Sequence, residues 1–132
     1  MSFLLDTDIC SAYLRNVSSV ANRFLQYSGR LYLSVVTLAE LEVWILQKRT
    51  PRRYKQALPV LLRDVVVLDV HRDIADLAGS VGADLRDQGL KMDTPDLLIA
   101  ATALFHGLTL VTHNTQDYIN VPGLALADWL VP

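Results

Sequence analysis

The sequence is poor in the residues that build disulfides and zinc sites. It contains one cysteine, Cys10, and three histidines that are scattered along the chain. A single thiol cannot form an internal disulfide, and without a cysteine partner or clustered histidines it cannot complete a zinc site. Because free cysteines are usually buried as small apolar residues, we expect Cys10 to fill space in the core.

Long apolar runs and an excess of positive charge are also missing. No apolar segment approaches the roughly 20 residues that a membrane-spanning helix needs, and the first residues lack the basic start of a signal peptide. These absences predict a cytoplasmic protein without membrane contact. Lys and Arg total 12 against 14 Asp and Glu, a formal net charge of −2. Any nucleic-acid function must therefore depend on local features rather than on global charge.

The remaining composition is that of one compact domain spanning residues 1–132. At 52% hydrophobic and 20% charged residues, the chain can bury a sizeable core but is too short for two ordinary domains. Short apolar runs that favour strands occur at 3–5, 31–36, 65–70 and 108–112. Patterns that favour helices fill the intervals, at about 8–14, 19–27, 38–48, 50–63, 72–87 and 94–107. This alternation predicts an α/β/α sandwich with a mostly parallel sheet of four to five strands.

The segment 94–107 predicts a buried helix with a polar start. Thr94 is a suitable N-cap, Pro95 suits the first helical position, and Gly107 suits the end. Nearly every residue between them is apolar or small, and Asp96 in the first turn is the one charge. A carboxylate there can simply complement the helix dipole, so a structural role for Asp96 is the alternative to a chemical one.

Four acidic residues are expected at one edge of the sheet. Asp6 follows the first strand, Glu40 opens the helix after the second, Asp117 follows the last, and Asp96 begins a helix that runs back along the sheet. In open α/β sheets, ligands bind outside the carboxyl ends of the strands. Glu40 also matches a capping box with Thr37 as the cap, which is its structural alternative.

Converging carboxylates repel one another and favour a counter-cation. Oxygen donors without cysteine or histidine suit Mg²⁺, with Mn²⁺ as a second possibility. Carboxylates that hold such ions can activate water for phosphodiester hydrolysis. The pattern therefore favours a metal-dependent phosphodiesterase.

Four segments together resemble one family. They are 4–8 (LLDTD), 34–41 (SVVTLAEL), 96–103 (DLLIAATA) and 110–118 (LVTHNTQDY). In this order and spacing, over essentially the whole chain, they resemble a PIN domain, and specifically a VapC-type toxin ribonuclease of bacterial toxin–antitoxin pairs. The resemblance implies an Mg²⁺-dependent endoribonuclease that is usually a homodimer and is silenced by a cognate antitoxin protein.

The resemblance also assigns roles to residues. It implies that Asp6 and Asp96 are the main metal ligands, that Glu40 completes the catalytic set, and that Asp117 helps to hold a second ion. Polar positions that line the substrate pocket correspond to Thr7, Thr112 and Asn114. His113 stands where many relatives carry arginine, which removes one expected phosphate contact or makes it dependent on pH.

Two other functions are consistent with parts of the pattern. The Asp6–Thr7–Asp8 segment resembles the nucleophile motif of haloacid-dehalogenase-like phosphatases, although Cys10 departs from that motif and the chain is short for that fold. A non-catalytic binding module would use the four acids only as helix caps. Five of the eight residues in 48–55 are basic, which indicates either a solvated helix junction or a patch for RNA phosphates.

Overall fold

The computed structural model describes residues 1–131 as alternating strands and helices. The elements are β1 (Phe3–Leu5), α1 (Thr7–Leu14), α2 (Ser18–Gln26), β2 (Leu31–Ser34), α3 (Val35–Ile45), α4 (Arg52–Asp64), β3 (Val66–Leu68), α5 (Arg72–Asp87), α6 (Thr94–His106), β4 (Thr109–Val111), α7 (Thr115–Tyr118) and β5 (Leu126–Ala127). None of the helices in this part of the chain is long and apolar enough to cross a membrane.

The five strands form one parallel sheet in the order β3-β2-β1-β4-β5. The central strand β1 pairs with β2 on one side and with β4 on the other, where Leu5 is in register with Val111. The chain therefore runs outward from β1 to β3, crosses over, and continues outward on the other side. That reversal creates a topological switch point between β1 and β4, where ligands bind in open α/β sheets. The predicted sandwich with a mostly parallel sheet is confirmed.

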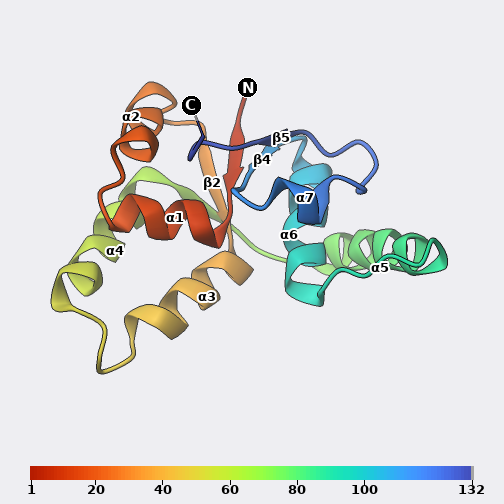
Figure 1. Ribbon diagram of the computed structural model, residues 1–132, viewed down its shortest axis with the longest axis horizontal. Coiled ribbons are helices and arrows are strands. Elements are labelled where there is room, and N and C mark those ends of the chain that lie inside the picture. Colours follow the sequence, from red (N-terminus) through yellow and green to blue (C-terminus); the bar gives the residue numbers. More distant parts are fainter. Residues whose placement is uncertain (132) are drawn as a thin grey trace.

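Helices cover both faces of the sheet (Figure 1). Successive side chains of a strand point to opposite faces, so Phe3 and Leu5 pack into the core formed with α1, α2 and α4. Leu4 packs on the other face with residues of α6 such as Ile99 and Ala103. Cys10 is fully buried in the first of these cores, and burial raises the pKa of its thiol well above its ordinary value. Its predicted role as core filler is confirmed.

Two helices begin elsewhere than the sequence predicts. Helix α3 begins at Val35, with Ser34 as the N-cap whose side chain accepts from the Val36 N–H. Thr37 therefore lies inside the helix, buried and without a hydrogen-bond partner for its hydroxyl. The N-cap position of α6 is occupied by Asp93 rather than Thr94. The Thr37 capping box and the Thr94 cap are both wrong. For Thr37 the reason is that β2 ends at Ser34, earlier than the apolar run through Val36 indicates.

Candidate acidic active site

An acidic cleft of about 210 Å³ lies at the carboxyl edge of the sheet, at the β1–β4 switch point. Its lining comes from α1, α3, α6, α7 and the segment after β4: Asp6, Thr7, Asp8, Glu40, Asp96, Ile99, Asn114, Asp117 and Tyr118. All four predicted acids are present, together with a fifth, Asp8. Every charged side chain of this lining is a carboxylate.

Asp6 lies at the base of the cleft, at the junction of β1 and α1. It is the N-cap of α1, and its Oδ1 accepts the Ile9 N–H at 3.0 Å. Only 6% of the residue is exposed. Burial is the main reason that the pKa of Asp6 rises from 3.8 to about 6, with the Asp8 charge adding to the increase and hydrogen bonds from Thr112 and Ile9 opposing it. The carboxylate is therefore held in place but poorly compensated.

Glu40 reaches the cleft from the middle of α3. Its Oε1 accepts the Thr7 hydroxyl at 2.5 Å, which links α3 to the first residue of α1. Because the helix begins five residues earlier, Glu40 does not cap its own helix. The structural alternative for this residue is thereby removed, and its exposed carboxylate faces the cleft.

Asp96 lies in the first turn of α6 and is half-buried. Its Oδ1 accepts the Tyr118 hydroxyl at 3.2 Å. Burial raises the pKa of Asp96, the Tyr118 hydrogen bond lowers it, and the charges of Glu40, Asp117 and Asp93 raise it. The helix-dipole interaction and the position in the cleft therefore coexist at this residue.

The segment after β4 completes the cleft. Asn114 donates from Nδ2 to Asp8 at 2.5 Å, and its backbone N–H donates to the Thr112 hydroxyl at 3.0 Å. Thr112 is fully buried behind the cleft, so in this structure it supports Asn114 and Asp6 rather than lining the substrate pocket. Asp117 lines the cleft from α7 with an exposed side chain. His113 pairs with Asp128 at 3.0 Å and does not line the cleft.

The donor chemistry of the cleft fits a hard divalent cation. Such cations take carboxylate oxygens, and the mutual repulsion of these acids is relieved by positive charge. Within residues 1–131, however, no three carboxylate, histidine or cysteine side chains are arranged to hold one ion as they stand. Three of the carboxylates are instead engaged by the hydroxyl or amide groups of Thr7, Tyr118 and Asn114. A cation would have to draw the carboxylates away from these donors or use their second oxygens.

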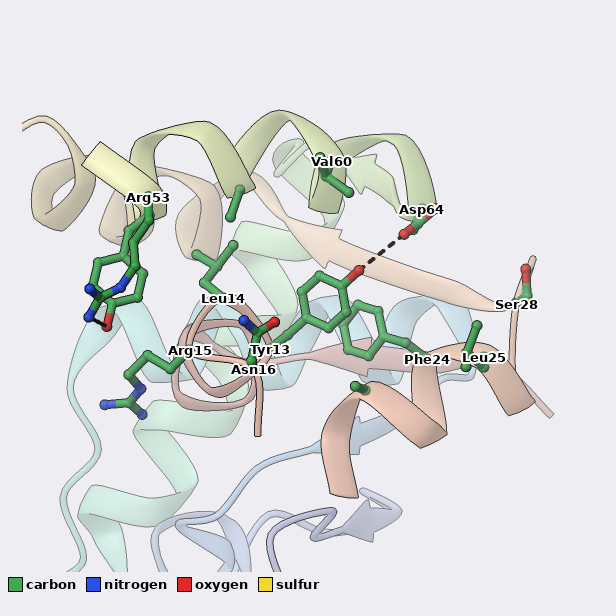
Figure 2. Close-up of a pocket in the computed structure, with 13 residues that line it drawn as sticks. Tyr13, Leu14, Arg15, Asn16, Phe24, Leu25, Ser28, Arg53, Val60 and Asp64 are labelled. Atoms are coloured by element: carbon green, nitrogen blue, oxygen red, sulfur yellow. Dashed lines mark hydrogen bonds between the residues drawn. The ribbon is translucent and has the colours of Figure 1, made fainter. Parts of the chain in front are cut away.

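A cavity larger than the acidic cleft lies away from the acids. It has a volume of about 530 Å³ and is lined by residues of α1, α2 and α4 and the segments that follow α1 and α2. In Figure 2 the rings of Tyr13 and Phe24 lie against each other, and the Tyr13 hydroxyl points to Asp64. Of the five basic residues in 48–55, Arg53 lines this cavity and none lines the acidic cleft. This apolar, partly basic hollow is unsuited to metal chemistry.

Sequence reasoning missed two residues of the cleft. Asp8 is not among the four acids expected there, although its place in the first turn of α1 puts it in the lining of the cleft. Tyr118 is buried and donates to Asp96, and burial raises its pKa beyond the ordinary tyrosine range. The signal for Tyr118 was an aromatic residue with a hydroxyl directly beside the fourth acid, which a pattern of acids alone does not reveal.

Comparisons with known proteins agree with this geometry. Residues 3–124 match the PIN domain family model. The chain is 34% identical over 130 residues to the tRNA(fMet)-specific endonuclease VapC of Shigella flexneri, covering 98% of each chain. It superposes on VapBC of Salmonella typhimurium in a DNA-bound crystal structure, with TM-score 0.90, 28% identity and coverage of 98% of both chains. For VapBC2 of Rickettsia felis bound to promoter DNA, the TM-score is 0.89, with 26% identity and coverage of 98% and 99%.

Proposed function

The chain belongs to the PIN-domain family and is a ribonuclease of the VapC type, and on that premise we propose that its acidic cleft cuts RNA with the help of Mg²⁺, Mn²⁺ being the alternative ion. The observation that carries the proposal is that acids from α1, α3, α6 and α7 line one cleft at the sheet's switch point. Family membership sets aside the phosphatase and the non-catalytic binding module. We treat residues 1–132 as one nuclease domain, which the family match over 3–124 supports.

Three aspartates would hold the metal: Asp6, Asp96 and Asp117. Asp6 is fixed by its cap hydrogen bond and Asp96 by Tyr118, whereas Asp117 is exposed and is placed only by its short helix. When bound, such ions lower the pKa of water and stabilise charge on the attacking and leaving oxygens. The buried Asp6 and half-buried Asp96 supply the negative charge that would attract the ions.

Glu40 would orient the attacking water as the remaining catalytic acid. Thr7 fixes one carboxylate oxygen of Glu40, which leaves the other oxygen to accept a hydrogen bond from water. Thr7 and Asn114, at the cleft walls, would contact the substrate backbone, and Thr112 would support Asn114 from behind. Attack on the phosphorus with departure of the 3′ oxygen leaves a 5′-phosphate on one product and a 3′-hydroxyl on the other.

The substrate is proposed to be RNA in the cytoplasm, and the first to test is tRNA, because the Shigella relative is named for it. The partner is a cognate antitoxin, as the solved relatives contain toxin and antitoxin together. We place one antitoxin segment in the large cavity of Figure 2, where Leu25 and Val60 are 79% and 45% exposed. Arg15 and Arg53 at this cavity would pair with acidic side chains of that segment.

A homodimer is proposed through α3. Val43 and Leu46 are 68% and 72% exposed and lie along a shallow groove of about 370 Å³. A two-fold interface uses the same patch of both subunits, and five of the six residues that line this groove are apolar, Glu42 being the exception. The α3 surface and the large cavity are built from different residues, so dimer and antitoxin can bind at once.

The deciding experiment is cleavage of a total-RNA pool with sequencing of the 5′ ends. Wild type and Asp6→Asn are each incubated with Mg²⁺ and with EDTA, and Asp87→Asn, an exposed acid at the end of α5 that does not line the cleft, serves as a matched control. Discrete cuts by wild type and Asp87→Asn that need Mg²⁺ support the proposal. Equal patterns from wild type and Asp6→Asn, in samples shown by mass spectrometry to carry no bound partner, contradict it.

A further inference from the structure

A second, smaller cavity adjoins the acidic cleft. It has a volume of about 150 Å³ and lies between α7 and the loop that joins α5 to α6. Its lining is Leu85, Leu90, Lys91, Met92, Gln116, Asp117 and Asn120. Asp117 lines both hollows, so this cavity continues the cleft on the side of α7.

The chemistry of this cavity differs from that of the cleft. Leu85, Leu90 and Met92 give it an apolar wall, while Lys91, Gln116 and Asn120 add one cation and two carboxamides. In residues 1–131 none of these three polar side chains forms a hydrogen bond or an ion pair with another side chain. The donors and acceptors of the cavity are therefore available to a ligand.

The position of Lys91 matters because RNA is a polyanion. Phosphate contacts by lysine and arginine supply much of the affinity for nucleic acid, yet the acidic cleft has no basic residue in its lining. Lys91 is the basic residue in the lining of the adjoining cavity. A strand whose reactive phosphate lies among the acids can reach this cation with a neighbouring phosphate.

The remaining residues suit a base. Unstacked bases are recognised by stacking against aromatic or apolar side chains and by hydrogen bonds to their edges. Carboxamides of asparagine and glutamine offer both a donor and an acceptor to such an edge. A lining that combines apolar side chains with two carboxamides therefore fits a nucleobase better than it fits a metal ion or a small anion.

We propose that this cavity is the subsite for the nucleotide that flanks the cleaved bond, in which Lys91 binds the neighbouring phosphate and Gln116 and Asn120 recognise the base. The assignment rests on the proposed ribonuclease function and goes beyond it, because it names residues that select the sequence. The three side chains are exposed and lie outside the metal-binding and catalytic set.

The test compares Lys91→Gln with Arg23→Gln, which removes an exposed positive charge of α2 that lies outside the 48–55 cluster and lines neither hollow. We expect Lys91→Gln to raise KM several-fold, to leave kcat and Mg²⁺ affinity unchanged, and to reduce the slope of log KM against log salt by about 0.7, the value for one phosphate contact on a single strand. Arg23→Gln should change none of these quantities. Equal effects of the two variants would overturn the role of Lys91.

Base recognition is read from the sequenced 5′ ends of an RNA pool. Gln116→Ala and Asn120→Ala should relax the nucleotide preference beside the cut while cleavage and melting temperature persist. An unchanged preference in both variants would overturn the subsite while leaving the nuclease intact. Failure of the wild type to cut any RNA would instead overturn the proposed function, and the subsite with it.

Discussion

The hydroxyl of Tyr118 donates a 3.2 Å hydrogen bond to Oδ1 of Asp96. This bond connects Tyr118, the last residue of α7, to the first turn of α6. Because α7 also carries Asp117, the bond helps to hold that acid beside Asp96. Residues that hold metal ligands in place typically contribute 10–100-fold to metal affinity. Tyr118→Phe should therefore weaken Mn²⁺ binding about tenfold, measured by calorimetric or paramagnetic-resonance titration. Tyr54→Phe removes a hydroxyl outside the cleft and should have no effect; equal affinities of wild type and Tyr118→Phe would contradict the prediction.

The metal-free protein should lose stability as pH rises from about 4 to above 6. The folded-state pKa of Asp6 is about 6 against an ordinary 3.8, so the folded state binds more protons than the unfolded state in this window. The stabilisation is fully present below 3.8, the pKa of Asp6 in the unfolded state, and is lost as the pH rises through about 6, its pKa in the folded state. The free energy of unfolding falls by about 3 kcal/mol at most.

The variant Asp6→Asn tests whether ionisation of Asp6 causes this loss of stability. Asparagine caps a helix as well as aspartate does but carries no charge, so the variant should be more stable than wild type at pH 7.5 in EDTA and similar at pH 4. Urea denaturation at several pH values measures the difference. Parallel stability–pH curves for the two proteins would show that Asp6 is not responsible.

Addition of Mg²⁺ should reverse part of this instability. A ligand that binds only the folded state stabilises it by about 2.7 kcal/mol at 100 times its Kd. Calorimetric melting with and without Mg²⁺ should show the increase in wild type and in Asp87→Asn, but much less of it in Asp96→Asn. An equal increase in all three proteins would place the ion outside the cleft.

The dimer and the antitoxin complex should respond to different substitutions. Leu46→Glu puts a charge into the proposed apolar contact between two α3 helices and should give monomers in light scattering.

Leu25→Glu puts a charge into the large cavity. It should leave the dimer intact and should weaken antitoxin binding by at least tenfold, measured by calorimetry. If Leu46→Glu remains a dimer, or if Leu25→Glu binds antitoxin like the wild type, the corresponding surface is assigned wrongly.

The sheet, its parallel strands and the four converging acids could be predicted from the sequence. Apolar runs and helix patterns identify the strands, and parallel strands place the residues that follow them at a single edge. The start of α3 could not be predicted, because Val35 and Val36 suit a strand as well as a helix, and only the Ser34 cap settles the boundary. Tyr118 and Lys91 were missed because their importance depends on which side chains face one another across a cleft.

The cleft draws its residues from almost the full length of the polypeptide. Asp6 lies near one end, while β4, which pairs with β1, and Tyr118 lie near the other. A chain in which β4 and α7 have not yet joined the sheet therefore carries Asp6, Glu40 and Asp96 without the strand and the hydroxyl that bring the site together. We therefore expect these acids to converge only in the folded domain, once β4 and α7 are in place beside β1 and α6.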